Sequence, residues 1–401
     1  MLSIVKDFSD EILMKIFSLL DSEDILSTLT VHEKFHRLAF DDSLWRGTRQ
    51  FDKINLSRKL VPSALIEELF EHGTKYLCLD GATILNKITI RNEDGSEKIV
   101  HNFGEKKEDL PQYDSIKFLD LSHVRFKANS GEIPSETTNR YLSRILVMCP
   151  SLKKLSLQGL RISNQIFTHY ISAKQTLTHL NLFACSGLVW SDIQKIVVRC
   201  DGLIELNLGN CKLSPSHNWA NGRRTDVNLE SVCANLPCNM QKLSLCNLEI
   251  NDEAVQKLVN RCPNLIELDL YGHRNDNLTG KSATSIIKVL SHSLVKLAIP
   301  CLAEETKPLE LASMPKLQFL WMPGLSNRRR KILKKQVPHL KINESDIEDL
   351  LSRTIASPRE IYSSHQGFWQ LPCSVTNYNS VKSILSEVDE KWTHLGDLES
   401  S

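Results

Sequence analysis

Long apolar runs are missing from this 401-residue sequence. None approaches the roughly 20 residues that a membrane helix needs. The formal net charge is only +1, which argues against a broad surface for polyanions, although local patches can still bind acidic partners. We therefore expect neither a membrane nor a nucleic acid as a partner.

The sequence also lacks the motifs of common catalytic and metal sites. It contains no phosphate-binding glycine loop, no nucleophile elbow, no zinc-protease helix and no zinc-spaced set of cysteines and histidines. The 13 histidines are scattered along the chain. We therefore expect no enzyme activity, no catalytic residue, no metal ligand and no cofactor.

Paired cysteines are missing as well, since none of the 11 cysteines forms a C-x-x-C motif. The N-terminus, MLSIVKDFSDEILMKIF, interrupts its apolar residues with charges, unlike a secretory signal. We therefore expect reduced thiols in the cytosol or nucleus. Free cysteine packs like a small hydrophobe, so we interpret the cysteines as inert and buried. The best examples stand at fixed positions of a repeat: Cys149, Cys185, Cys200, Cys211 and Cys262.

What the sequence does contain is a recurring sequence motif. CPSLKKLSLQGL at 149–160 returns almost unchanged as CPNLIELDLYGH at 262–273. Copies of L-x-x-L-x-L begin at Ile116, Leu152, Leu177, Leu203, Met240, Leu265, Leu294 and Leu317. This pattern and its spacing are typical of leucine-rich repeats. Polar inserts, FKANSGEIPSETTNR and SPSHNWANGRRTD, lengthen two of the units, and weaker half-repeats stand at 76–84 and 339–345.

The repeat predicts an α/β solenoid. Each unit supplies one short strand and one return segment, and only stacking of units buries their apolar sides. We expect a parallel β-sheet on the concave face and helices on the convex face. Two return segments read clearly as helices, 190–200 and 251–262, the latter with Ala254, Val255, Leu258 and Val259 on one face.

The concave face is the expected binding surface, because side chains alternate along a strand. Charges of alternating sign at Glu205, Lys242, Glu267 and Lys296 favour pairing between strands. Four aromatic residues on this face are either binding anchors or contacts for the chain's own tail, and both interpretations stay open. The candidate substrate- or partner-binding residues are Lys154, His179, Asn181, Phe183, Asn207, Lys242, Asp269, Tyr271, Phe319 and Trp321.

Residues 7–45 do not follow the repeat and fit three short helices. Ser9 is a suitable N-cap for the first, which carries a wide apolar stripe from Ile12 to Leu20. About 40 residues are marginal for an independent domain. Either a partner helix completes this apolar surface, or the helices dock on the repeats.

This segment resembles an F-box. FSDEILMKIFSLL, VHEKF at 31–35 and SLW at 43–45 match its pattern, with Ser9, His32 and Phe35 replacing the usual proline, cysteine and tryptophan. The resemblance implies binding to a Skp-type adaptor. The residues that would bind it are Phe8, Ile12, Leu13, Ile16, Phe17, Leu20, Leu26, Val31, Phe35, Leu44 and Trp45.

The repeats, from CPSLKKLSLQGLRIS to VPHLKIN, are similar to those of the S-phase kinase-associated F-box protein family. The resemblance divides the chain into an F-box at 1–50, a linker and N-terminal capping or irregular first repeat at 51–115, a solenoid at 116–342 and a tail at 343–401. In that family the tail folds back along the concave face, and GFWQLPCS at 367–374 is its best anchor here.

The resemblance implies the substrate-recognition subunit of an SCF-type cullin–RING ubiquitin ligase, in the nucleus and cytoplasm. In the best-known member the substrate is a phosphorylated cyclin-dependent-kinase inhibitor, and a small Cks accessory protein helps to hold it. The charges that would serve a Cks protein are largely absent here. The alternative is a leucine-rich-repeat scaffold without a ligase role.

The basic run NRRRKILKKQ at 327–336 has two interpretations. It is either an acidic-partner or nuclear-import patch, or a solvated helix with Ile332, Leu333 and Val337 facing inward.

Overall fold

The structure is a computed structural model. It describes residues 8–20, 24–25, 28, 32–39, 41, 44, 53–85, 87–91, 97–102, 110–128, 131–132, 135–163, 171, 176–214, 216–220, 223–272, 277–300, 307–322 and 325–342. The predicted tail at 343–401 and the predicted adaptor residues Leu26, Val31 and Trp45 lie outside these residues.

The chain divides into two compact units, residues 1–243 with 253–265 and residues 244–252 with 266–401. The described helices are α2 (Asp10–Phe17), α4 (Glu33–Ala39), α5 (Ser63–Glu71), α6 (Ser135–Met148), α8 (Trp190–Arg199), α9 (Leu229–Ala234), α10 (Asp252–Arg261), α11 (Gly280–Leu290), α12 (Lys307–Ala312) and α13 (Asn327–Gln336). The described strands of the main sheet are β1 (Lys53–Asn55), β3 (Tyr76–Cys78), β7 (Phe118–Asp120), β10 (Lys154–Ser156), β11 (His179–Asn181), β13 (Glu205–Asn207), β17 (Lys242–Ser244), β18 (Glu267–Asp269), β19 (Lys296–Ala298), β20 (Phe319–Trp321) and β21 (Lys341–Ile342).

In the first unit the strands follow the order β1-β3-β7-β10-β11-β13-β17. The paired strands are parallel and in register, so that equivalent repeat positions stand side by side. Lys154 pairs with His179 and His179 with Glu205, for example. This is the stacking that the repeat predicts, and the α/β leucine-rich-repeat fold is confirmed.

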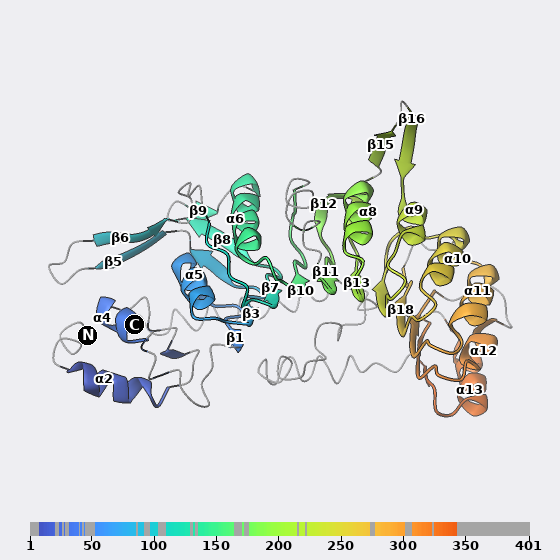
Figure 1. Ribbon diagram of the computed structural model, residues 1–401. Coiled ribbons are helices and arrows are strands. Elements are labelled where there is room, and N and C mark those ends of the chain that lie inside the picture. The colour runs from blue at the N-terminus through green and yellow to red at the C-terminus, as the bar shows by residue number, and fades with distance from the viewer. Residues whose placement is uncertain are drawn as a thin grey trace. The chain divides into compact units, whose positions relative to one another are not determined.

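Strands and helices bury their apolar sides together, and the helices gather on one side of the sheet within this unit (Figure 1). Leu180 and Leu182 of the third repeat are fully buried, and so is the inner face of α8, formed by Ile193, Ile196 and Val197. Asp192 accepts a hydrogen bond from the amide of Val189 (3.2 Å) at the start of α8. The four residues predicted to form the inner face of α10 are all buried, which confirms that prediction. We call the opposite side of the sheet, formed by the outward strand positions, the strand face.

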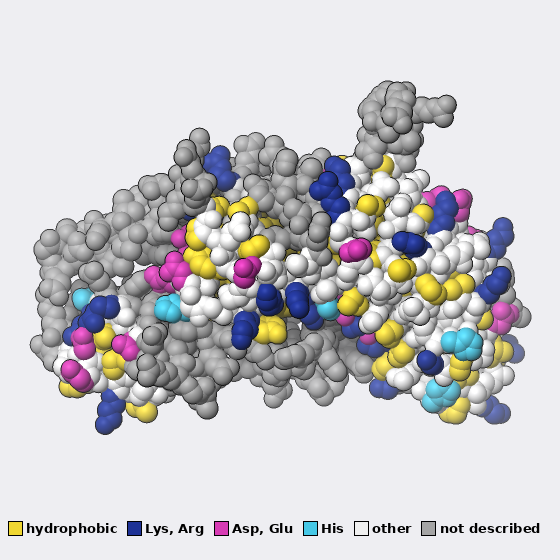
Figure 2. Space-filling model, viewed as in Figure 1, with side chains coloured by type: hydrophobic (Ala, Val, Ile, Leu, Met, Phe, Trp, Pro, Cys, Tyr) yellow, Lys and Arg dark blue, Asp and Glu magenta, His cyan; other side chains and the backbone are white. Residues whose placement is uncertain are grey.

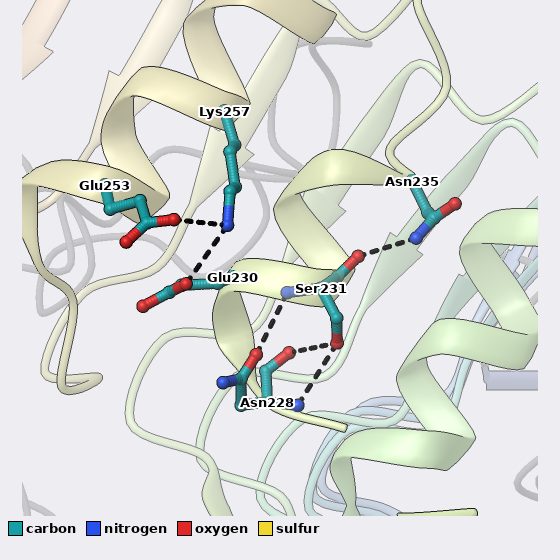
Figure 3. A network of polar contacts seen from close by, with 6 residues as sticks. All are labelled: Asn228, Glu230, Ser231, Asn235, Glu253 and Lys257. Carbon is teal, nitrogen blue, oxygen red and sulfur yellow. Dashed lines mark hydrogen bonds and ion pairs between the residues drawn. The ribbon is translucent and has the colours of Figure 1, made fainter. Parts of the chain in front are cut away.

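A polar network joins neighbouring repeats on the helix side (Figure 3). Lys257 of α10 contacts Glu230 of α9 at 3.1 Å and Glu253 of its own helix at 2.7 Å. The Asn228 side chain accepts a hydrogen bond from the amide of Ser231 (3.0 Å) and caps α9. These contacts link neighbouring repeats through their helices, away from the strand face.

Besides the main sheet, the described part of the first unit contains four smaller sheets. They comprise β2 (Leu60–Pro62), β4 (Thr83–Leu85), β8 (Arg125–Ala128) and β9 (Gly131–Glu132) in one sheet, β12 (Ser186–Val189) with β14 (Lys212–Ser214), and two antiparallel hairpins, β5 (Lys87–Arg91) with β6 (Glu97–Asn102) and β15 (Ser216–Ala220) with β16 (Arg223–Val227). The second hairpin forms most of the polar insert predicted at 214–226 and stands out from the unit in Figure 1.

One boundary differs from the sequence interpretation. The sequence places the stretch SETTNR in a polar insert, but in the structure it opens helix α6, in which Tyr141, Leu142 and Ile145 are buried. Within the predicted linker and N-terminal capping or irregular first repeat at 51–115, β1 pairs with β3 and β3 with β7 of the sheet. Strand β3 lies in the half-repeat predicted at 76–84.

In the second unit the strands follow the order β18-β19-β20-β21 and are parallel. The register places Glu267 beside Lys296, Lys296 beside Phe319, and Phe319 beside Lys341. The half-repeat predicted at 339–345 supplies the last described strand, β21.

Candidate functional site

Helix α2 packs against α4 through aromatic rings. Phe17 and Phe35 meet edge to face, with ring centroids 5.4 Å apart and an interplanar angle of 77°. Asp10, at the start of α2, forms an ion pair with Lys34 of α4 at 3.2 Å. Leu13 and Phe17 are almost completely buried. Phe17 therefore packs α2 against α4, and both predicted adaptor residues point into the protein instead of to its surface.

The other side of α2 carries an apolar stripe that remains exposed. Phe8 is 37% exposed, Ile12 46%, Ile16 41% and Leu19 82%. Ile12 and Ile16 lie one turn apart on one face of α2, and Phe8 and Leu19 lie just outside its two ends. We call these four side chains the α2 stripe. Their exposure matters because such large apolar groups normally lie inside a protein or at an interface.

The remaining predicted adaptor residues fall into different environments. Leu44 is buried, and Leu20 and Phe35 are half-buried. Leu19, in contrast, was not among the predicted adaptor residues, although this side chain just after the end of α2 is 82% exposed. Its position seven residues after Ile12 was the signal that could have identified it.

Two departures from the F-box pattern have local structural roles. Ser9 has the extended backbone of an N-cap, but its side chain accepts no capping hydrogen bond from the helix, contrary to the expectation for this residue. His32 is buried, and its Nδ1 accepts a hydrogen bond from the amide of Lys34 (3.1 Å). The imidazole thus replaces a capping side chain at the start of α4.

On the strand face of the first unit, Glu205 lies between two basic side chains. Its carboxylate is 3.2 Å from the Lys242 ammonium and 3.4 Å from Nε2 of His179. Burial alone would raise the pKa of Glu205, but its interactions with His179 and Lys242 outweigh burial and hold that pKa below its usual value. Glu205 therefore stays ionised, and the cross-strand pairing expected here is present.

The second unit contains a comparable pair. Lys296 contacts Glu267 at 3.2 Å, and its ammonium lies 5.6 Å from the centre of the Phe319 ring. The ammonium of Lys341 lies 5.0 Å from the same centre. Phe319 is half-buried and contacts two cations, an arrangement that favours both partners.

The predicted binding residues at the ends of the strands have a capping role. Side-chain Oδ1 atoms accept hydrogen bonds from the amide two residues later: Asn181 from Phe183 (3.1 Å), Asn207 from Gly209 (2.9 Å) and Asp269 from Tyr271 (3.0 Å). Asn181 and Asn207 are also buried. Their side chains fix the turn after each strand, which limits what they can offer to a partner.

The aromatic residues on the strand face are less exposed than the sequence predicts. Phe183 and Trp321 are half-buried, and Tyr271 is buried. Tyr271 follows the end of its strand, where its carbonyl accepts a hydrogen bond from the Asn247 amide (2.7 Å) and the chain turns back. Burial raises the pKa of the Tyr271 hydroxyl. Lys154 is half-buried on β10.

The cysteines form part of the repeat core. The thiol of Cys185 donates to the carbonyl of Leu157 (3.0 Å), and the thiol of Cys211 donates to the carbonyl of Leu182 (2.8 Å), each in the preceding repeat. Cys149, Cys200 and Cys262 are completely buried. Burial is confirmed for these five cysteines, and hydrogen bonds to the preceding repeat explain the cysteine position after L-x-L. Cys238 is exposed, so the prediction was wrong for that residue.

The basic run forms helix α13. Leu333 and Val337 face the core as predicted, but Ile332 is 47% exposed, so the expectation for that residue was wrong. Ile332 precedes the inward Leu333 by about 100° of helix rotation and therefore points elsewhere. Since the run is folded into a helix, its backbone is not available as an extended targeting peptide.

Among the described residues there is no group of histidines, cysteines and carboxylates that could hold a metal ion. In the same part of the chain no helix has both the length and the apolar character needed to cross a membrane.

The α2 stripe and the solenoid define a leucine-rich-repeat protein with F-box-like helices. A family model described as F-box-like matches residues 10–49, and one described as the SKP2 LRR domain matches residues 112–376, well over half of the chain. The chain therefore belongs to the family of F-box proteins with an SKP2-type leucine-rich-repeat domain.

Individual relatives are distant. F-box/LRR-repeat protein 5 of Xenopus tropicalis is 25% identical over 218 residues, covering 47% of this chain and 30% of the relative. The crystal structure of the Rad7 and Elc1 complex in yeast has a TM-score of 0.46 and 15% identity, and covers 85% of this chain and 89% of that chain. The match thus spans less than a third of the length of the curated relative.

Proposed function

We propose that this chain is the substrate-recognition subunit of an SCF-type cullin–RING ubiquitin ligase, with the F-box bound to a Skp-type adaptor and the repeats bound to a protein substrate. Such a subunit performs no chemistry itself. It raises the effective concentration of substrate lysines near a ubiquitin-loaded enzyme elsewhere in the complex.

One observation carries this proposal: the α2 stripe is exposed although Leu13 and Phe17 already complete the helix packing. Helices that merely cap a solenoid would turn such a stripe inward, because exposed apolar surface is unfavourable in water. A stripe of Phe8, Ile12, Ile16 and Leu19 instead fits burial against an apolar groove or helix of another protein.

The experiment is co-purification of the full chain with a recombinant Skp-type adaptor. Ile12→Asp with Ile16→Asp places two charges in the α2 stripe while leaving the buried residues intact. The control, Glu11→Asp with Ser18→Asp, changes two other exposed positions of the same helical segment. Leu13 and Phe17 are unsuitable for this test, since charges there would disrupt the helix packing.

We expect a stable one-to-one complex for the wild type and for the control, and its loss in the Ile12, Ile16 variant. A wild type that remains monomeric beside excess adaptor would instead support the alternative, a leucine-rich-repeat scaffold without a ligase role. Circular dichroism of the variants checks that the helices remain folded.

The finer parts of the proposal follow from the family. They are a cell-cycle inhibitor as substrate, recognition of its phosphorylated form, a location in the nucleus and cytoplasm, and a tail at 343–401 that folds back along the strand face. Binding of a phosphorylated and an unphosphorylated inhibitor peptide, each with and without a Cks protein, tests the first two. A requirement for neither the phosphate nor the Cks protein would reject this substrate class.

A further inference from the structure

A row of lysines lies at the beginning of three neighbouring strands in the first unit. Lys75, Lys117 and Lys153 each precede the strands β3, β7 and β10 by one residue. The amide of Lys117 donates to the carbonyl of Lys75, and that of Lys153 donates to Lys117, both at 2.9 Å. The backbone therefore holds consecutive lysines about 4.8 Å apart, one strand spacing.

A second row extends this surface along the strands themselves. The register places Tyr76 beside Phe118 and Phe118 beside Lys154. The rings of Tyr76 and Phe118 are 6.2 Å apart, and Tyr76 is 37% exposed. We call the six side chains of both rows the basic-aromatic patch: Lys75, Tyr76, Lys117, Phe118, Lys153 and Lys154. Figure 2 shows dark blue and yellow side chains gathered over these strands.

Among the described residues, three of the four lysines in this patch, Lys117, Lys153 and Lys154, lack the carboxylate partners that Lys242 and Lys296 have. The Lys117 ammonium donates to the carbonyl of Asp114 (2.7 Å), whose carboxylate accepts from Ser151 (2.6 Å). No ion pair forms with Lys117, Lys153 or Lys154 within the described part of the chain, whereas carboxylates neutralise Lys242 and Lys296. Neighbouring like charges on a sheet are unfavourable, so an external anion would relieve a repulsion already present.

We propose that the basic-aromatic patch binds an extended acidic peptide segment of a protein partner. Three strands span about 10 Å, the reach of three or four extended residues. Carboxylates or phosphates of the segment would pair with the lysines, and an apolar side chain would cover Tyr76 and Phe118. The Glu205 carboxylate lies farther along the same face and ends the positively charged surface. A surface of this length suits a short peptide better than a continuous nucleic-acid backbone.

Calling the partner a substrate rests on the proposed function, but peptide binding itself does not. Helix α13 is the natural competitor for an anion, because it concentrates arginine and lysine on an exposed helix. It therefore supplies the matched control: the variants K75E/K117E/K153E and R328E/K331E/K335E change the net charge equally.

The test is fluorescence anisotropy with the full chain and a labelled decapeptide of alternating glutamate and glycine, in about 0.05 M salt, where charge screening is weak. We expect binding that weakens as salt rises. The lysine-row variant should lose at least about tenfold in affinity, and the α13 variant less than about threefold. Tyr76→Ala with Phe118→Ala should weaken a peptide carrying one central leucine more than the leucine-free peptide.

Three outcomes would overturn the proposal. They are no binding by the wild type, equal losses in the two charge variants, or tighter binding of a ten-residue oligothymidylate than of the peptide, which would indicate a nucleic-acid surface. Melting temperature reports whether each variant is folded. Adaptor co-purification of the same variants separates this result from the proposed function, because the lysine-row variant should retain the adaptor.

Discussion

The carboxylate of Glu205 lies 3.2 Å from the ammonium of Lys242 on the neighbouring strand, and the His179 ring approaches it from the other side. Glu205 is only 7% exposed. A buried carboxylate is tolerated only when opposite charges or donors satisfy it. The three residues come from three successive repeats, so the pairing joins those repeats across the strand face.

This arrangement predicts a pH-dependent stability. The pKa of Glu205 is lowered in the folded protein, so its contribution is fully present above the unfolded pKa, about 4.3, and is lost as pH falls through the folded value. Glu205→Gln should lower the free energy of unfolding by about 1–3 kcal/mol at neutral pH. The difference should shrink below about pH 4. Urea unfolding at both pH values measures this.

Glu267→Gln is the control for this prediction. Glu267 pairs with Lys296, whose side chain is 50% exposed, so solvent screens the pair. Its replacement should cost less than about 1 kcal/mol. Equal losses for the two variants would show that burial of Glu205 does not strengthen its pairing.

The strand-end caps give a second prediction. Asp269→Ala removes the acceptor for the Tyr271 amide and should lower the free energy of unfolding by about 1–3 kcal/mol. Asp269→Asn keeps Oδ1 as the acceptor and should lose much less. Urea unfolding of both variants distinguishes them. If the asparagine variant were as unstable as the alanine variant, the charge of Asp269, and not its capping bond, would matter.

The sequence predicts the solenoid well because every repeat places leucines at the same inward-pointing positions. Leu180, Leu206 and Leu268 occupy one inward position, and their spacing along the chain fixes the strands. The helix at 251–262 was predictable for the same reason, since its apolar residues follow one helical face. These features depend on local pattern alone.

The orientation of α2 could not be predicted in this way. Its apolar residues, from Ile12 to Leu20, cover more than half of the helix circumference, so the pattern alone does not distinguish the inner face from the outer. Packing of Phe17 against Phe35 decides it. Tyr271 was likewise missed, because its burial depends on how the chain turns after β18. The start of α6 was missed because its first residues are polar.

A third prediction concerns two glycines with left-handed backbone. Gly187 has φ +85°, and a Cβ there would lie 2.6 Å from the carbonyl oxygen of Ile162. Gly73 has φ +79°, but a Cβ would meet nothing within 4 Å. Gly187 also lies where the register between β12 and β14 shifts. The two positions therefore share the strain of an L-residue but differ in the clash.

Gly73→Ala should cost about 1–2 kcal/mol, the strain of a left-handed alanine. Gly187→Ala should cost more, by about 1–3 kcal/mol, because a main-chain carbonyl must shift. Differential scanning calorimetry of both variants measures the difference. Identical melting temperatures would mean that the backbone around Ile162 moves without cost.

The last prediction concerns thiol reactivity. Of the nine cysteines within the described residues, only Cys238 is exposed. Burial raises the pKa of Cys185 and of Cys262 to about 12, so little reactive thiolate forms at neutral pH. With Cys301 and Cys373 replaced by serine, a thiol reagent should label one group per folded chain and nine in urea. Cys238→Ser should abolish the labelling of the folded chain. Rapid labelling of more than one thiol would show that the repeats open, because a buried thiol inside a stacked solenoid reacts only when its repeat separates from its neighbours.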